Sequence, residues 1–208
     1  QFTSPINIAI PSGNFGNAYS AWFGRENGLP INEIFCASNV NDVLTRFISS
    51  GKLEPKETIP SVAPSMDIQI PSSLERLIYN LEGEASSFYD QLQSEKIANL
   101  TEESTVKLQN IFSSLSFDDE MILKEIELFY KNYGWIIDPH TATALSSSTS
   151  FSSNLPVVGV ATASPEKFSD VISKIIDEFT VENEKNEEKF LVQKANSSLV
   201  ENTIKEHL

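Results

Sequence analysis

The chain has 208 residues, enough for one sizeable core or two small ones, and its hydrophobic content of 40% is ordinary for a globular protein. Its 29 acidic residues outnumber its 15 basic residues, and the formal net charge of −14 argues against a nucleic-acid partner, whose phosphates would be repelled. No apolar run approaches the roughly 20 residues that cross a bilayer, so we expect no membrane partner.

Strand and helix signals alternate over the first part of the chain. Ile6–Ile10 is a short apolar run that predicts a strand, and the helical pattern after it runs to Gly28. Glu33–Ser38 predicts a second strand, which is followed by an amphipathic helix over Asp42–Ser50. This β-α-β-α order is typical of a parallel sheet covered by helices, so we expect an α/β fold.

Polar and small residues mark the ends of the second helix, and a long connection follows it. We expect Asn41 to be the N-cap of this helix and Gly51 to end it. Residues 52–72 contain four prolines and no clear period, which predicts an irregular segment. Loops of this length inside a compact domain are often functional.

The second half of the chain has a mainly helical pattern. Apolar stripes predict helix throughout about 73–133, and a strand is expected over Val157–Thr162. Ser164 and Pro165 are a cap and a first-turn residue for a further helix, whose apolar face extends to Phe179. The charged residues that follow predict a peripheral helix or tail.

The content of cysteine and histidine limits redox and metal chemistry. Cys36 is the only cysteine, which excludes an internal disulfide and fits a reducing compartment, so we expect a cytoplasmic protein. It lies in the apolar run Ile34–Ala37, where a buried and inert thiol is expected. One cysteine and two histidines are too few for a structural zinc site, and we expect no metal.

A turn with two glycines separates the first strand from the first helix. The sequence Ser-Gly-Asn-Phe-Gly-Asn at 12–17 allows a tight turn with no side chain in the way, so several backbone N–H groups can converge on one anion. The helix that starts near Gly16 adds its free amides and the positive end of its dipole. A β-α turn with two glycines can also be only a turn, and these residues alone leave both interpretations open.

A second motif is Asp-Pro-His-Thr-Ala at 138–142. The hydroxyl of Thr141 can cap a helix, or it can form a hydrogen bond with the pyridine nitrogen of a bound cofactor. A neutral hydroxyl in that place would leave the ring nitrogen largely unprotonated. His140 has no serine, cysteine or metal-ligand cluster near it in the sequence, so we expect a packing or supporting histidine.

A third motif spans Pro64–Arg76. Either Ser72 or Ser73 can be a helix N-cap, with Glu75 completing a capping box. Asp67 can orient the loop or belong to a site, and the sequence does not decide between these roles.

Five segments in one order resemble threonine synthases closely. They are Ile8–Pro30 with its glycine loop, Ala37–Leu44, Pro64–Arg76, Tyr133–Ala142 and Val157–Pro165, and together they cover about residues 6–178. The chain differs from the family pattern at three places, namely Ser73, Thr143-Ala144 and Ser164.

The resemblance implies a fold-type II pyridoxal-phosphate (PLP) enzyme, the fold of tryptophan synthase β-chains, with a mainly helical insertion. The reaction would convert O-phosphohomoserine and water to threonine and phosphate. Thr141 would face the pyridine nitrogen of the cofactor. The cofactor phosphate would be held by Ser12, Gly13, Asn14, Phe15, Gly16 and Asn17.

The resemblance also divides the chain into four parts. Residues 1–82 and 133–180 would belong to the PLP domain, residues 83–132 would be the helical insertion, and residues 181–208 would be the acidic helix or tail. The Schiff-base lysine of the family has no counterpart here, so we expect the C-terminal portion of a threonine synthase that is inactive alone. An alternative is a non-catalytic module that binds an anion or a protein partner, and a weaker one is another PLP lyase of this fold.

Overall fold

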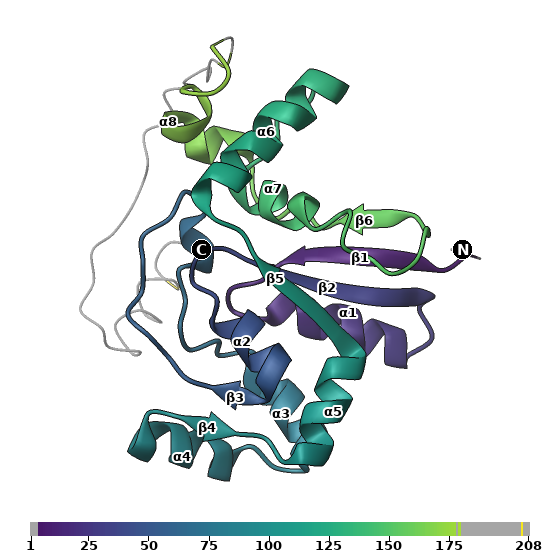
Figure 1. The fold of residues 1–208 in the computed structure, drawn as a ribbon, viewed down its shortest axis with the longest axis vertical. Helices are drawn as coiled ribbons and strands as arrows, with labels where there is room; N and C mark the ends of the chain where they lie inside the picture. The colour runs from purple at the N-terminus through teal and green to yellow at the C-terminus, as the bar shows by residue number, and fades with distance from the viewer. Residues whose placement is uncertain (1–3, 178, 180–204, 206–208) are drawn as a thin grey trace.

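A four-stranded parallel sheet forms the centre of the protein. The computed structural model describes residues 4–177, 179 and 205. The strands are β1 (Ile6–Pro11), β2 (Ile31–Ser38), β5 (Phe112–Ser116) and β6 (Val157–Gly159), in the spatial order β5-β2-β1-β6 (Figure 1). All three neighbouring pairs are parallel, so the expected α/β fold with a parallel sheet is confirmed.

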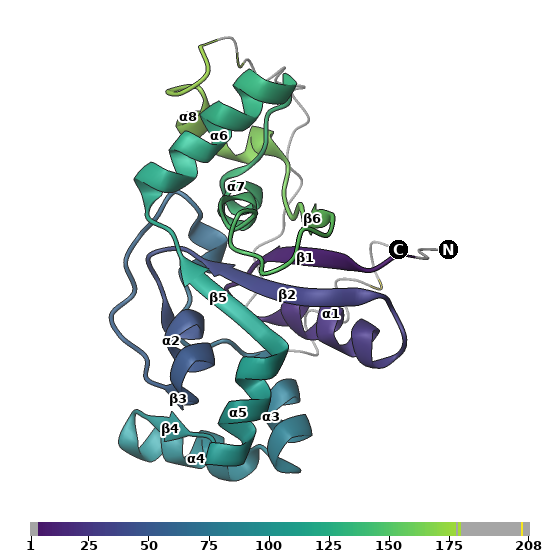
Figure 2. The same ribbon diagram turned by 45° about the vertical axis from the view of Figure 1, so that its right-hand side comes forward.

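Helices cover both faces of this sheet (Figures 1 and 2). One face carries α1 (Gly16–Glu26), α2 (Val43–Ser50), α3 (Leu74–Glu82), α4 (Ser86–Glu95) and α5 (Glu102–Ile111). The other face carries α6 (Asp119–Tyr133), α7 (Pro139–Ser146) and the short α8 (Ser169–Ile172). Two short strands, β3 (Lys52–Leu53) and β4 (Ala98–Asn99), pair antiparallel below the main sheet, and two 3-10 turns are η1 (Pro64–Met66) and η2 (Pro165–Phe168).

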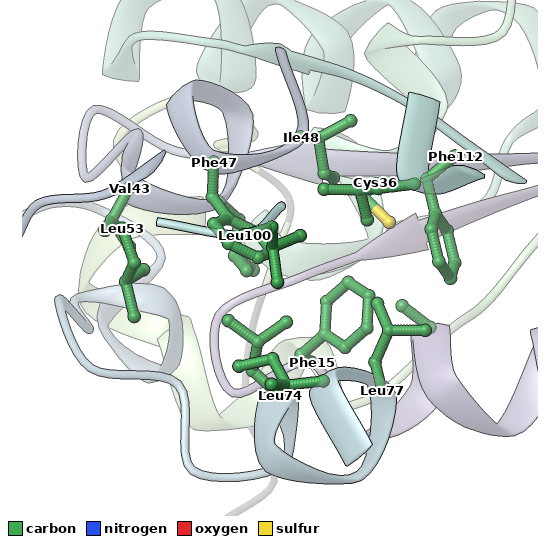
Figure 3. Close-up of a cluster of buried hydrophobic side chains, with 14 of the residues drawn as sticks. Phe15, Cys36, Val43, Phe47, Ile48, Leu53, Leu74, Leu77, Leu100 and Phe112 are labelled. Carbon is green, nitrogen blue, oxygen red and sulfur yellow. The ribbon is translucent and has the colours of Figure 1, made fainter. Parts of the chain in front are cut away.

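Strand β2 divides its side chains between two hydrophobic cores. Ile34 and Cys36 point into the core beneath α1 to α5, whereas Phe35 and Ala37 point into the core beneath α6 to α8. This is the two-residue alternation of a strand that is buried on both faces. Figure 3 shows the first core, where Cys36 lies among side chains from the helices.

The structure contains no described helix long and apolar enough to cross a membrane.

The ends of the second predicted helix differ in detail from our expectation. Gly51 ends α2 in a left-handed conformation with φ of 72°, as predicted. The N-cap, however, is Asp42, and Asn41 does not cap the helix. The side chain of Asn41 is instead occupied by the long connection, because its amide binds the carbonyl of Ile59 at 2.8 Å and the carboxylate of Asp67 at 2.9 Å.

The prediction of helix throughout 73–133 was wrong at two places. The segment is mainly helical, but β4 and β5 interrupt it, and β5 pairs with β2 in the main sheet. The sequence of β5, Phe-Ser-Ser-Leu-Ser, has little β-propensity, so tertiary pairing decides its conformation. Ser114 contributes by donating its hydroxyl hydrogen to the carbonyl of Cys36 at 2.6 Å. Whether 83–132 is an insertion in the evolutionary sense stays a prediction.

The prediction of one long helix after Pro165 was also wrong. The backbone of Phe168 has φ of −120° and ψ of 29°, which separates the 3-10 turn η2 from α8. The apolar stripe still packs on the second core, where Ile172 and Ile176 are buried. The strand predicted over Val157–Thr162 ends at Gly159. The predicted tail, 181–208, lies outside the described residues except for residue 205.

Candidate anion-binding site at the end of strand β1

The candidate site lies where β1 ends and α1 begins, at the carboxyl ends of the parallel strands. A cavity of about 240 Å³ opens there. Three parts of the chain line it, namely 11–17, the turn at Ser65 and Met66, and the pair His140 and Thr162. Ligands of open parallel sheets bind at this end of the strands, and the position therefore fits a binding site.

The backbone amides of the glycine loop are free to bind a ligand. In the described part of the chain, the N–H groups of residues 13–17 donate to no protein acceptor. They lie at the N-terminus of α1, where the helix dipole adds a partial positive charge. Ser12 is different, because its N–H donates to the carbonyl of Ala37 at 2.8 Å and its hydroxyl to that of Ile10 at 3.1 Å. The loop therefore offers five N–H groups without a described acceptor, and Ser12 secures the end of the strand.

The two glycines do not act as the sequence suggested. A Cβ atom on Gly13 would lie 2.7 Å from Cα of Met66 and 3.1 Å from the carbonyl oxygen of Ser65, so only glycine fits. A Cβ on Gly16 would meet only the hydroxyl of Ser73, at an ordinary 3.6 Å. Neither glycine has a positive φ. The requirement for glycine is thus a close approach of two backbones at Gly13.

Phe15 makes the tight turn that we had assigned to the glycines. Its φ of 70° lies in the left-handed region, which is unusual for a residue with a side chain. The ring is buried and packs edge-on against Phe112, with 5.2 Å between ring centroids (Figure 3). Since such conformations persist only where the surroundings hold them, the packing of the ring fixes the shape of the loop.

Asn14 connects the loop to the start of α3. Its side-chain oxygen accepts from the N–H of Ser72 at 2.7 Å and from the hydroxyl of Ser72 at 2.9 Å. The predicted capping box is absent, because Ser73 occupies the N-cap position but forms no capping bond with its side chain. Ser73 has helical backbone angles, φ of −76° and ψ of −8°, whereas a capping side chain requires an extended residue.

Asp67 orients the long connection, which decides between the two roles left open by the sequence. Its Oδ1 atom accepts from the side chains of Asn39 at 2.7 Å, Asn41 at 2.9 Å and Ser61 at 2.7 Å. Its Oδ2 atom accepts from the N–H of Ser61 at 3.1 Å. Asn39 and Asn41 are buried, and the sequence analysis missed their role. Two asparagines directly after a buried strand were the available signal, since buried amides need partners.

Asp138 is the N-cap of α7, and it organises the second motif. Its side chain accepts from the N–H of His140 at 3.0 Å and from the N–H of Thr141 at 3.5 Å. Burial alone would raise the pKa of Asp138, but the hydrogen bonds from His140 and Thr141 outweigh it and hold the pKa below its usual range. Thr141 is therefore a first-turn residue and not the cap. Pro139 at the first helical position was the signal that could have identified the cap.

The hydroxyl of Thr141 is already engaged in this structure. It forms a short hydrogen bond with Oδ2 of Asp138. Because an ionised carboxylate can only accept, the hydrogen belongs to Thr141 and points toward Asp138. Thr141 is buried and is not among the residues that line the cavity. The structure therefore brings His140, but not Thr141, to the glycine loop.

The ring of His140 is held from both sides. Its Nδ1 atom lies 2.9 Å from Oδ1 of Asp138, and its Nε2 atom accepts from the N–H of Ser65 at 3.1 Å. An imidazole that accepts at Nε2 and donates at Nδ1 is neutral, with its hydrogen on Nδ1. The ring is 3% exposed and packs edge-on against Phe168. His140 is a supporting residue of the cavity wall, as the sequence indicated.

Cys36 and the ionisable groups add no further chemistry to the site. Burial raises the pKa of Cys36 to about 12, despite a hydrogen bond with Ser12 that lowers it, so the thiol is inert as expected. Among the residues that the structure describes, no cluster of three His, Cys, Asp or Glu could hold a metal ion.

A larger groove of about 990 Å³ lies away from the loop, between α3 and α4. It is lined by aromatic side chains such as Tyr79 and Tyr89, and the guanidinium of Arg76 lies 5.8 Å from the ring centroid of Tyr19. It shares no lining residue with the cavity at the glycine loop. Size alone favours this groove, but the residues of the glycine loop, whose N–H groups have no acceptor in the described part of the chain, line the smaller cavity.

Comparison with known proteins assigns the fold and shows which proteins this chain resembles. No protein-family model matches the sequence. The chain is 30% identical over 175 residues to threonine synthase from Pseudomonas aeruginosa, which covers 81% of this chain and 37% of that protein. It is 33% identical over 183 residues to human threonine synthase-like 1, which covers 85% of this chain and 25% of that protein. A crystal structure of PLP-bound threonine synthase from Brucella melitensis superposes with a TM-score of 0.85 and 27% identity, over 98% of this chain and 46% of that one.

These matches define the class of the fold and the relatives of this chain within that class. The parallel sheet and its flanking helices have the fold of the fold-type II PLP enzymes. Within that class, the chain is similar to threonine synthases over most of its own length and matches the C-terminal portion of these proteins. The chain spans less than half the length of each of these three relatives.

Proposed function

We propose that this chain supplies the phosphate-binding part of a PLP site in a threonine synthase. The complete protein would convert O-phosphohomoserine and water to threonine and phosphate. The observation that carries the proposal is that the N–H groups of residues 13–17 have no acceptor among the described residues, and that these residues line a cavity at the N-terminus of α1. The Brucella relative is described as PLP-bound, and its fold matches over 98% of this chain.

The residues of the loop would contribute to phosphate binding in different ways. The N–H groups of residues 13–17 would donate to its oxygens, and the helix dipole would stabilise its charge. Ser12 would act indirectly by fixing the end of β1 against β2, because its own N–H is taken by Ala37. Gly13 would keep the loop close to Met66, where any side chain would displace one of the two backbones.

Thr141 would contact the ring nitrogen of the cofactor only after a local change. Its hydroxyl hydrogen points to Asp138, so a bond donated to the nitrogen requires rotation of the hydroxyl. When bound, PLP would supply the electron-withdrawing ring that stabilises negative charge on the substrate. The contribution of Thr141 would be to hold the ring nitrogen in its neutral form.

The amine that binds PLP covalently would come from outside this sequence. No lysine is among the described residues that line the cavity. We therefore propose that the chain holds the cofactor through its phosphate and does not catalyse the reaction alone. In this proposal the catalytic lysine lies in the part of threonine synthase that the matched region does not include.

PLP binding by the 208-residue chain tests the proposal directly. Equilibrium dialysis should show weak, saturable binding of PLP that inorganic phosphate displaces. Treatment with borohydride, followed by mass spectrometry of peptides, should fix no stoichiometric adduct at a single lysine. A specific adduct would show that the chain carries its own PLP-binding lysine. PLP binding that phosphate does not displace would show that the glycine loop does not bind the cofactor phosphate.

A further inference from the structure

The turn Pro64–Met66 forms the wall of the cavity that faces the glycine loop. It is a short 3-10 turn in an otherwise irregular connection, so its own backbone does little to fix it. Contacts with three other parts of the chain hold it in place. On one side, Met66 and Ser65 touch the backbone at Gly13, where an added Cβ would lie within 2.7 Å and 3.1 Å of their atoms.

A second contact lies directly behind the turn. The carboxylate of Asp67 accepts hydrogen bonds from Asn39, Asn41 and Ser61, which anchors the residue after the turn to the end of β2. Asn39 also donates to the carbonyl of Ala63 at 3.2 Å, on the other side of the turn. Both ends of the turn are therefore attached to the sheet.

The third contact comes from α7 and ends at the tip of the turn. The N–H of Ser65 donates to Nε2 of His140 at 3.1 Å, and no other side chain among the described residues accepts from this N–H. His140 in turn depends on Asp138, which accepts the Nδ1 hydrogen at 2.9 Å and so selects the tautomer with a free lone pair at Nε2. The Asp138–His140 pair thus joins the cap of α7 to the wall of the cavity.

We propose that His140 is a positioning residue, which holds the Ser65–Met66 turn against Gly13 and thereby sets the width of the anion cavity. The role requires the neutral Nδ1–H form, since the cation and the Nε2–H form have no acceptor for Ser65. The part of this inference that concerns ligand affinity rests on the proposed phosphate-binding function, whereas the attachment of the turn does not.

Two substitutions separate positioning from mere packing. His140→Gln places an amide oxygen near the position of Nε2 and can still accept from Ser65. His140→Asn places its amide near Nδ1, so it can still donate to Asp138 but cannot reach Ser65. Both remove the aromatic contact with Phe168.

Hydrogen exchange and phosphate titration of the 208-residue chain measure the two parts of the inference. In His140→Asn, exchange of the Ser65 amide should accelerate about fivefold or more, and the dissociation constant for inorganic phosphate should rise by a similar factor. In His140→Gln both values should stay near those of the wild type. Equal effects in the two variants, or an unchanged Ser65 amide in His140→Asn, would overturn the proposal.

A measurement on the wild type keeps the inference testable if a variant does not fold. The ¹⁵N shifts of the His140 ring at pH 7 should show a neutral imidazole with its hydrogen on Nδ1. A ring with its hydrogen on Nε2, or with both nitrogens protonated, would refute the proposal. If the wild type binds no phosphate but the tautomer and the exchange rates are as expected, the proposed function fails while the positioning role of His140 holds.

Discussion

The two motifs assigned to the cofactor differ in how their polar groups are used. In the glycine loop, the N–H groups of residues 13–17 have no protein acceptor in the described part of the chain. At the start of α7, the N–H groups of His140 and Thr141 and the hydroxyl of Thr141 all bind Asp138. The loop is therefore prepared for an anion, whereas the second motif is satisfied internally and must rearrange to contact a ligand.

Substitution of Gly13 by aspartate should have the largest effect on binding. A carboxylate beside the loop would oppose a phosphate, and the dissociation constant should rise at least about 100-fold. Titration of the 208-residue chain with inorganic phosphate measures this loss. Gly13→Ala is the matched control, because it meets Met66 in the same way without the charge. If the two variants bind phosphate equally well, a charge at the loop does not affect binding, and the phosphate does not bind at this loop.

Removal of Asp138 should mainly affect stability, because its partners are internal. Asp138→Ala leaves the hydrogen-bond donors of His140 and Thr141 unpaired in a buried place, and we expect a loss of about 3 kcal/mol in the free energy of unfolding. The control is Asp118→Ala at the exposed N-cap of α6, which accepts from Met121 at 2.9 Å. That change should cost about 1 kcal/mol. Urea unfolding compares the two, and equal losses would contradict the buried network.

The charge of Asp138 should appear in the acid dependence of stability. Its folded pKa is held below the ordinary value by the hydrogen bonds from His140 and Thr141, against the effect of burial. Its contribution is therefore complete above the unfolded pKa of about 4 and is lost as the pH falls through the lower folded value. The free energy of unfolding should fall less steeply below pH 4 in Asp138→Asn than in the wild type. Identical slopes would show that Asp138 titrates normally.

The smallest effect is expected at Gly16. An alanine there meets only Ser73 at 3.6 Å and removes the entropy cost of glycine at the start of α1, so stability should be unchanged or rise by up to about 1 kcal/mol. Gly13→Ala, in contrast, should lower it by about 2 kcal/mol because a backbone must move. Thermal unfolding of both variants checks whether the two glycines differ as the geometry requires.

The sequence predicted those helices and strands that local residue patterns and end residues identify. β1 and β2 are apolar runs between turn residues, and α1 and α2 end at residues suited to that place, so these elements were found. β5 was missed because it owes its conformation to pairing with β2 and not to its serine-rich sequence. Similarly, the prediction of one long helix after Pro165 failed because the backbone of Phe168 is not helical, and the helix propensity of phenylalanine gives no sign of this.

At the candidate site, residue types were easier to predict than their roles. The glycine loop stands out because strand, glycines and helix follow directly in the chain. The use of Phe15 for the left-handed turn depends on Phe112, nearly a hundred residues away, and the reason for Gly13 depends on Met66. The hydrogen bonds that Asn39 and Asn41 donate to Asp67 likewise depend on the tertiary structure. Contacts between distant segments decide such roles, and a single sequence does not specify them.

Titration of the ¹⁵N-labelled chain with inorganic phosphate tests the central claim most directly. The account predicts saturable shifts of the amides of residues 13–17, with little change at Ser12, whose N–H already donates to Ala37. Absence of saturable shifts in the loop, or shifts confined to the groove around Arg76, would contradict the assignment of the phosphate cradle.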